Sequence, residues 1–148
     1  MHIVLVEPEI PHNTGAAGRL ALATDSTLHL VKPLGFLLDE KSVRRAGLDY
    51  WKDVDLQVWE SFDDLLTAHP EARIWFLSTK AKKSAWAVDF QQEDFLVFGR
   101  ETKGLPEDWL DERAIRIPMK EDSTRSLNLA TSVAIVLYEA QRQVGELK

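Results

Sequence analysis

Short apolar runs that alternate with segments of helical pattern are the feature that most restricts how this chain can fold. The runs, such as IVLV at residues 3–6 and FLVFG at residues 95–99, are typical of buried strands. We expect strands at residues 3–6, 28–31, 56–59, 73–79, 95–99 and 114–118, and helices at residues 13–24, 39–47, 61–68, 106–110 and about 126–145. This alternation predicts an α/β fold, with a mostly parallel sheet and helices on both faces.

Residues suited to helix ends stand where the helices are expected to begin and stop. Asn13, Asp39 and Ser61 are good N-caps, because their side-chain oxygens can accept a hydrogen bond from a free backbone N–H of the first turn. Gly47 is expected to end the second helix, and Pro106 fits the first turn of the fourth.

Length and hydrophobicity indicate the class of protein. The chain has 148 residues without a linker, repeat or low-complexity tract, so we expect a single domain over residues 1–148. Residues 126–138 form a run of 13 residues without charge, which suits a buried helix and is too short to span a bilayer. The first residues lack the pattern of a signal peptide. We therefore expect a soluble, cytoplasmic protein with no membrane partner.

The composition also restricts the chemistry. The chain has no cysteine, which excludes disulfides, thiolate metal ligands and a cysteine nucleophile. Its four histidines, at positions 2, 12, 29 and 69, do not pair at the spacing of zinc ligands. We therefore expect no metal.

The net charge of −6 is unusual for a protein dedicated to nucleic acids, which is usually basic. Contact with RNA would have to come from local patches, with modest and salt-sensitive affinity. Two basic clusters qualify, KSVRRAG at residues 41–47 and TKAKK at residues 79–83, although each can equally be a solvated charged face.

The first candidate motif is EPEIPHNTGAAGRLA, at residues 7–21. Glycines near a helix start suggest a nucleotide site, but the match to the dinucleotide fingerprint is poor, because two prolines intervene and only GAAG remains. The alternative is that small residues allow close helix packing. Arg19, among apolar neighbours, should either extend along the surface or face a polar cleft.

The second motif is FGRETKGLP, at residues 98–106. Ligands of parallel sheets bind at the carboxyl ends of strands, which is where Gly99 is expected. Glycine permits positive φ and the close approach of a ligand to the backbone. Glu101 could hold a ribose hydroxyl or orient a polar group. The alternative is an ordinary turn with solvated charges.

The third motif is IPMKEDSTRSLNLATSVAIVLYEA, at residues 117–140. Ser126 and Asn128 stand before an apolar helix and are suited to cap it. In a functional interpretation, this loop forms the second wall of a pocket whose first wall is residues 98–106.

Taken together, NTGAAGR, FGRETKGL and IPMKEDSTRSLNLATSVAIVLYE resemble the SPOUT superfamily of methyltransferases in its SpoU-like branch. The resemblance covers essentially the full chain. VEPEIPHNTGAAGRL, KPLGF and RRAGLDYW look like the minimal members that methylate the 2′-oxygen at the wobble position 34, C or U, of tRNA. The chain departs from the pattern in GAAG, and in one apparent extra residue within KEDSTRS.

The resemblance implies an α/β fold with a C-terminal trefoil knot, S-adenosylmethionine as cofactor, and a homodimer that shares its RNA site across the interface. It implies a catalytic role for Arg19, as a base or as a group that binds phosphate and polarises the hydroxyl. Glu101 would orient Arg19 or accept the proton, and Asn13, Ser126 and Asn128 would fix the nucleotide and the loop.

The resemblance also implies contacts to the cofactor and to RNA. RNA contacts are expected from Arg19, Lys80, Arg44 and Arg45. The expected cofactor contacts, largely through the backbone, are Leu77, Ser78, Thr79, Gly99, Gly104, Leu105, Ile117, Met119, Ser126 and Leu127.

Three other functions fit parts of the pattern. A SpoU-like enzyme could act on ribosomal RNA or on another tRNA position, although those enzymes often carry extra RNA-binding segments. A non-catalytic RNA-binding relative would be expected to lose Arg19, Glu101 or Asn128, and all three are present. A dinucleotide-dependent oxidoreductase would need an acidic residue closing the second strand, where this chain has Lys32 and Pro33.

Overall fold

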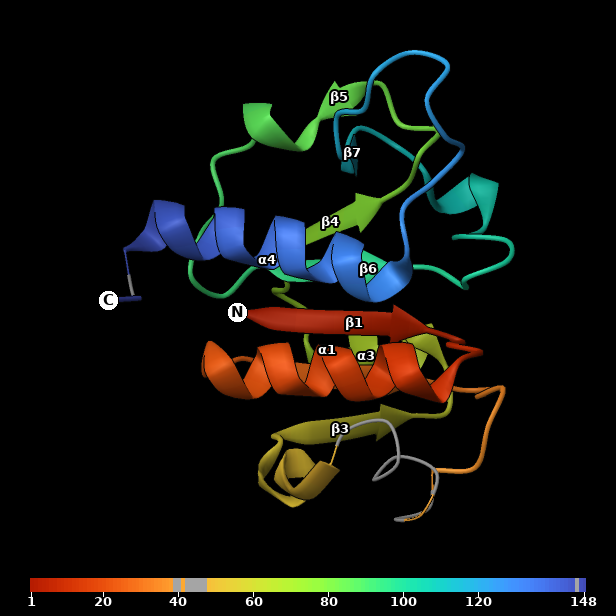
Figure 1. Cartoon of the computed structure of the whole chain (residues 1–148), viewed down its shortest axis with the longest axis vertical. Coiled ribbons are helices and arrows are strands. Elements are labelled where there is room, and N and C mark those ends of the chain that lie inside the picture. Colours follow the sequence, from red (N-terminus) through yellow and green to blue (C-terminus); the bar gives the residue numbers. More distant parts are fainter. Residues whose placement is uncertain (39–40, 42–47, 146) are drawn as a thin grey trace.

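The computed structural model describes residues 1–38, 41, 48–145 and 147–148, and its strands form one parallel sheet (Figure 1). The strand order is β3-β2-β1-β6-β4-β7-β5, and every recorded pair is parallel. The predicted parallel α/β sheet is therefore confirmed. The strands are β1 His2–Val6, β2 Thr27–Val31, β3 Leu56–Trp59, β4 Ile74–Leu77, β5 Lys83–Ser84, β6 Phe95–Phe98 and β7 Ala114–Arg116.

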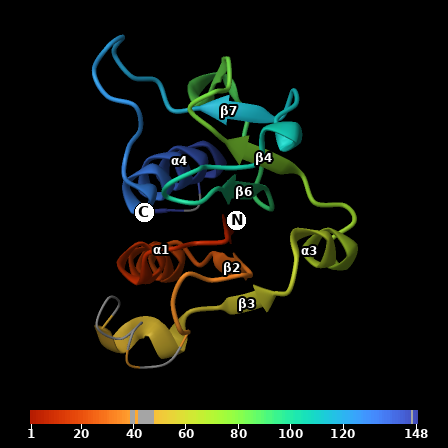
Figure 2. The ribbon, with the colours of Figure 1, turned by 90° about the vertical axis from the view of Figure 1, so that its right-hand side faces the viewer.

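Helices cover both faces of the sheet, as expected. Figure 2 shows α1 and α4 on one side of the strands and α3 on the other. The α-helices are α1 Pro11–Ala23, α3 Phe62–Ala68 and α4 Leu129–Val144, and the 3-10 helices are η1 Leu48–Asp53, η2 Ala85–Ala87 and η3 Glu107–Trp109. The expected helix at 106–110 is thus the short η3. Strand β5 and helices η1 and η2 were not predicted, and the expected helix at 39–47 lies outside the described residues except for Lys41.

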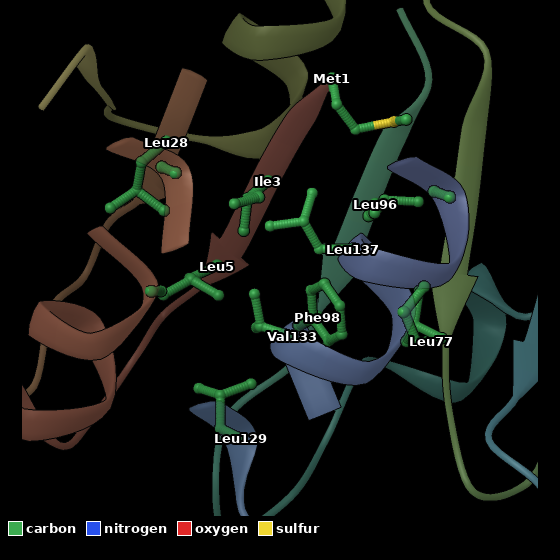
Figure 3. Close-up of a cluster of buried hydrophobic side chains, with 14 of the residues drawn as sticks. Met1, Ile3, Leu5, Leu28, Leu77, Leu96, Phe98, Leu129, Val133 and Leu137 are labelled. Atoms are coloured by element: carbon green, nitrogen blue, oxygen red, sulfur yellow. The ribbon is translucent and has the colours of Figure 1, made fainter. Parts of the chain in front are cut away.

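Two hydrophobic cores fill the space between the sheet and these helices. On the α1/α4 side, Ile3 and Leu5 of β1 pack with Leu137 of α4, and all three are fully buried (Figure 3). The residues between them along β1, such as Val4, point to the opposite core under α3, because successive strand side chains alternate between faces. Strands buried on both faces explain the unbroken apolar runs in the sequence.

The helix ends agree with the predictions at some positions and differ at others. Ser61 caps α3 by accepting a hydrogen bond from the Asp64 N–H at 3.1 Å, as predicted. Asn128 caps α4 as predicted, whereas Ser126 lies two residues before the cap and does not serve as one, and Gly145 ends the helix with a φ of 72°. The prediction that Asn13 caps α1 is wrong, because the helix already begins at Pro11, so Asn13 is inside the first turn with its side chain free for other partners.

The small residues of the GAAG stretch allow a close contact between α1 and η1. A Cβ added to Gly18 would lie 2.6 Å from the ring of Trp51, and the Tyr50 hydroxyl donates a hydrogen bond to the Gly15 carbonyl at 3.0 Å. The packing interpretation is therefore confirmed for Gly18.

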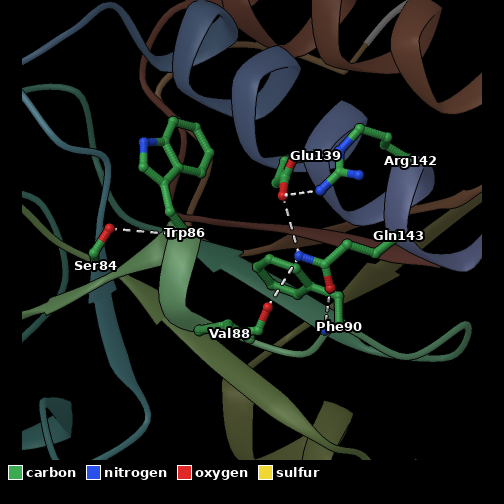
Figure 4. A network of polar contacts seen from close by, with 7 residues as sticks. All are labelled: Ser84, Trp86, Val88, Phe90, Glu139, Arg142 and Gln143. Atoms are coloured by element: carbon green, nitrogen blue, oxygen red, sulfur yellow. Dashed lines mark hydrogen bonds and ion pairs between the residues drawn. The ribbon is translucent and has the colours of Figure 1, made fainter.

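Polar contacts attach α4 to the segment that follows β5. The Gln143 side chain accepts a hydrogen bond from the Phe90 N–H at 2.8 Å and donates one to the Val88 carbonyl at 3.0 Å (Figure 4). Glu139 accepts from both Arg142 and Gln143, which holds the amide in place. The C-terminal helix is thus fixed to a segment more than fifty residues earlier, with separations of 53 and 55 residues.

Candidate functional site

A cavity of about 580 Å³ opens at the carboxyl ends of β4, β6 and β7. Its lining comes from the segments that follow these three strands and from the first turns of α1 and α4. Its position agrees with the rule for ligand sites in parallel sheets. Its volume lies within the range of small-molecule sites.

Every residue expected to contact a cofactor lines this cavity. They come from three separate loops, which are far apart in the sequence and meet because the strands that precede them are neighbours in the sheet. These residues are Leu77, Ser78, Thr79, Gly99, Gly104, Leu105, Ile117, Met119, Ser126 and Leu127. Four of the predicted catalytic residues line it as well: Asn13, Glu101, Ser126 and Asn128.

Glu101 joins the loop after β6 to the start of α1. Its carboxylate accepts hydrogen bonds from the backbone N–H groups of Glu9 at 2.8 Å and Ile10 at 3.2 Å, and a longer one from Asn13 Nδ2 at 3.5 Å. The N-terminal end of a helix favours a carboxylate there, because its N–H groups lack partners within the helix. Glu101 therefore holds the loop in place.

A second contact joins the same two segments, and here the loop donates the hydrogen bonds while the residue before α1 accepts them. The Glu9 carboxylate accepts hydrogen bonds from the Thr102 N–H at 3.1 Å and from the Thr102 hydroxyl at 2.8 Å. These hydrogen bonds lower the pKa of Glu9 below its ordinary value. Glu9 and the loop at Glu101–Thr102 thus bind each other reciprocally.

A chain of amide hydrogen bonds connects all three motifs. Because the Glu101 carboxylate can only accept, Asn13 directs its Nδ2 group to Glu101 and its Oδ1 atom to Asn128, whose Nδ2 donates at 3.1 Å. The Oδ1 atom of Asn128 then accepts from the Thr131 N–H at 3.2 Å and caps α4. Asn13, at the centre of this chain of bonds, is 6% exposed, whereas Asn128 is exposed to solvent.

The two glycines of the second motif have different roles. Gly104 has a φ of 67°, which favours glycine, and its N–H donates to the Arg100 carbonyl at 2.8 Å to close the loop. A Cβ added to Gly99 would lie 2.1 Å from the Gly104 carbonyl carbon and 2.3 Å from the Leu105 nitrogen. Gly99 is therefore required by the approach of the loop to its own backbone.

Arg19, the fifth predicted catalytic residue, lies apart from the others within one chain. It is exposed on α1, with its guanidinium 5.4 Å from the centre of the Tyr50 ring, and it is not among the residues that line the cavity. No hydrogen bond or ion pair joins it to Glu101 among the described residues. The expectation that Glu101 orients Arg19 is therefore wrong for a single chain.

The cavity also has basic residues that the sequence analysis did not select. Arg100, Lys103 and Arg125 line it together with the predicted Lys80. Lys103 lies within the second motif and Arg125 within the third, so their positions inside motifs were the available signal. The other expected RNA contacts, Arg44 and Arg45, lie outside the described residues.

Two other kinds of site are absent from the described part of the chain. There, no group of three or more His, Asp or Glu side chains is arranged to hold a metal ion. No helix among the described residues is both long and apolar enough to cross a membrane.

Comparison with known proteins gives curated relatives of similar length. The tRNA (cytidine(34)-2'-O)-methyltransferase of Escherichia coli (strain K12) is 46% identical over 149 residues, which cover 98% of this chain and 94% of the relative. A solved structure described as giving insights into the 2-OH methylation of C/U34 on tRNA superposes with a TM-score of 0.91 and 45% identity, covering 96% of this chain and 94% of that one.

A more distant structure contains the cofactor. The SpoU methyltransferase AviRb from Streptomyces viridochromogenes, in complex with AdoMet, matches with a TM-score of 0.81 and 25% identity, over 97% of this chain and 60% of AviRb. The SpoU rRNA Methylase family matches residues 1–138. The resemblance inferred from the three motifs is thereby confirmed, and the chain belongs to the SpoU rRNA Methylase family.

Proposed function

We propose that the protein transfers a methyl group from S-adenosylmethionine to the ribose 2′-hydroxyl at position 34 of tRNA. The observation that carries the proposal is the pocket in which Asn13, Glu101 and Asn128, one from each motif, are joined by hydrogen bonds. The 46% identity to the Escherichia coli enzyme supports position 34 in particular.

The pocket suits S-adenosylmethionine in size and in the chemistry of its lining. Leu77 and Leu105 are buried apolar residues suited to an adenine ring, while Ser78, Thr79 and Ser126 supply polar groups at other points of the wall. When bound, the cofactor supplies a methyl group activated by a sulfonium charge. The AdoMet-bound AviRb structure, which shares this fold, supports the assignment.

Within this proposal, Glu101 and Asn13 position the loop rather than take the proton. Both oxygens of Glu101 already accept hydrogen bonds from N–H groups near the start of α1. Holding the loops that surround the reacting atoms in one geometry is itself catalytic, because well-oriented groups can lower a barrier by several kcal/mol.

Arg19 is the residue we assign to the RNA. A guanidinium stays protonated at neutral pH, which makes it a poor base and a good ligand for phosphate. In the proposal Arg19 binds phosphate and polarises the attacking hydroxyl, whose proton passes to solvent water as the methyl group is transferred. Because Arg19 lies outside the cavity of its own chain, a second copy of the chain would bring it to the site.

A homodimer follows from that assignment. Leu22 on α1 and Tyr138 on α4 are 41% and 44% exposed, so the α1/α4 side carries apolar surface that a second copy could cover.

The proposal also includes the trefoil knot in the C-terminal part of the chain. Two observations support it. Strand β6 lies between β1 and β4 in the sheet, and residues 117–128 pass beside the cavity before α4 begins. The proposal also places the enzyme in the cytoplasm with its tRNA substrate.

A second candidate is methylation of ribosomal RNA by the same site, because the matching family is described as an rRNA methylase family. The deciding experiment uses purified protein, labelled S-adenosylmethionine, bulk tRNA and ribosomal RNA, followed by mapping of the labelled nucleotide. Label on the 2′-oxygen of tRNA position 34 supports the proposal. Label on ribosomal RNA alone supports the second candidate, and cofactor binding without transfer to either RNA supports a non-catalytic relative.

A further inference from the structure

Positive charge gathers around the cavity of a chain that is acidic as a whole. Lys80, Arg100, Lys103 and Arg125 line the cavity, and Glu101 is the single acidic side chain among the described residues that line it. The Glu101 carboxylate already accepts hydrogen bonds from backbone N–H groups near the start of α1. With a net charge of −6 for the chain, this rim is a local basic patch suited to a polyanion.

Lys80 has an acidic partner in the free protein. Its backbone N–H donates to the Ser78 side chain at 3.1 Å, which fixes the start of the loop after β4. Its ammonium group forms an ion pair with the carboxylate of Glu107, which belongs to η3. The Lys80 and Glu107 side chains are 61% and 74% exposed, so both face solvent.

The Glu107 carboxylate stays charged in this pair. The hydrogen bond from Lys80, with the attraction of its positive charge, holds the pKa of Glu107 below the ordinary value for glutamate. The negative charge of Glu107 therefore lies beside Lys80, which lines the cavity and also belongs to the basic TKAKK cluster.

We propose that Lys80 binds a phosphate of the RNA backbone at the mouth of the cavity, and that Glu107 occupies this contact until RNA displaces it. The inference rests on the proposed function, because it needs an RNA substrate at this cavity. A phosphate oxygen makes the same charge-assisted hydrogen bond to an ammonium as a carboxylate does. An exposed ion pair adds little to stability, so its loss is a small cost.

The consequence is that Glu107 weakens RNA binding in the unmodified protein. An arriving phosphate must both replace the carboxylate and approach its negative charge. An RNA that makes only this one contact would be bound poorly, whereas a substrate with further contacts would overcome the competition. Glu107 would thus tune affinity without touching the reacting atoms.

The test compares two neighbouring acidic residues. Glu107→Gln removes the carboxylate that pairs with Lys80, and Asp108→Asn, which changes the net charge by the same amount, removes the adjacent one, for which no ion pair is recorded among the described residues. The full-length protein is titrated with a tRNA transcript at several salt concentrations. Cofactor affinity is measured separately as a check on folding.

We expect Glu107→Gln to bind the transcript about two- to fivefold more tightly, the range that an exposed ion pair allows. Its plot of log affinity against log salt should be steeper by up to about one, because a released lysine gains a full phosphate contact. Asp108→Asn should change affinity less, and the gain from Glu107→Gln should largely vanish when Lys80→Gln is added.

Equal effects of Glu107→Gln and Asp108→Asn would show a general charge effect and overturn the inference, as would unchanged affinity in Glu107→Gln. If the unmodified protein methylates tRNA and Glu107→Gln binds the transcript no more tightly than the unmodified protein does, this inference alone fails. If the unmodified protein neither binds nor methylates tRNA, the proposed function fails and this inference fails with it.

Discussion

Asn128 donates a hydrogen bond from Nδ2 to Oδ1 of Asn13 at 3.1 Å, although 115 residues separate them in the sequence. The bond joins the start of α4 to the start of α1 at the wall of the cavity. It gives Asn128 two separable tasks, because the same side chain caps α4 through its other atom, Oδ1.

The two tasks of Asn128 can be tested with two substitutions. Asn128→Asp keeps an oxygen to accept from the Thr131 N–H, so the cap remains, but it removes the donor to Asn13. We expect methyl transfer to fall about tenfold to a hundredfold, because small misplacements of an active site cost this much. The melting temperature should change little.

The control is Asn128→Ala, which removes the cap as well and should cost a further ~0.5–2 kcal/mol of stability. Methyl transfer and thermal unfolding of both variants are the measurements. Full activity in Asn128→Asp would mean that the bond to Asn13 has no part in shaping the site.

The glycines of the second motif should respond unequally to the same substitution. In Gly99→Ala the new Cβ meets backbone atoms at 2.1 Å and 2.3 Å, which cannot move without opening the loop. In Gly104→Ala the Cβ enters open space, and only the left-handed φ of 67° is unfavourable, at about 1–2 kcal/mol.

We therefore expect Gly99→Ala to lose most cofactor affinity and Gly104→Ala to keep a measurable part of it. Titration calorimetry with S-adenosylmethionine gives the affinities, and thermal unfolding shows whether each variant is folded. Equal loss in both variants would indicate that the loop tolerates neither change and that the clash at Gly99 is not decisive.

Stability should fall in mild acid because of a buried histidine. His29 is fully buried, and its Nδ1 accepts a hydrogen bond from Trp59 Nε1 at 3.0 Å, so its neutral ring carries the proton on Nε2 and donates to His2 Nδ1 at 2.9 Å. Burial, with smaller effects from His2 and His69, lowers the pKa of His29 to about 3.

The sign of the effect follows from that depressed pKa. Between pH 3 and the unfolded pKa of about 6.5, the unfolded chain binds the proton and the folded chain does not, so stability falls as pH falls. The slope for one group is at most about 1.4 kcal/mol per pH unit. The pKa of His2 is lowered too, mainly by burial, and adds in the same direction.

Urea unfolding at pH 7.5, 6.5 and 5.5 tests this expectation. His29→Gln should be less stable at pH 7.5 and should show a flatter dependence on pH. His12→Gln, a change at an exposed position, is the control for the loss of a histidine elsewhere in the chain. An unchanged slope in His29→Gln would contradict the assignment.

Mixing two inactive variants tests whether Arg19 acts on a second copy of the chain. Arg19→Ala lacks the proposed phosphate ligand, and Gly99→Ala lacks the loop geometry of the cavity. If one copy supplies Arg19 to the other's cavity, a mixed dimer has one complete site, and refolding the two variants together should restore part of the methyl transfer. No recovery from a mixture shown to form mixed dimers would place Arg19 at its own chain's cavity.

Much of the cavity could be predicted from the sequence because its wall consists of loops that directly follow strands. Leu77 and Ile117 end or follow apolar runs, and the carboxyl ends of parallel strands meet at one edge of a sheet. The alternation of strand and helix in the sequence was sufficient to predict a parallel sheet. The second and third motifs of the family resemblance lie in these same loops.

The tertiary structure decided which of these residues meet. Asn13 has the residue type of a helix cap, but Pro11 starts the helix two residues earlier, and the side chain is used between Glu101 and Asn128 instead. Local preference is worth about 1 kcal/mol, so long-range contacts can override it. Likewise the short strand β5 exists only because β7 offers it a partner.

The sequence by itself thus determined every described strand except β5, the fold class and the loops that carry the site, since these depend on hydrophobic pattern and short motifs. Only the tertiary structure decided the strand order, the turning of Arg19 toward Tyr50 and away from the cavity, and the pairing of Lys80 with Glu107. The physical reason is that a side chain's partner across the fold is set by how distant elements pack, and no local pattern records that packing.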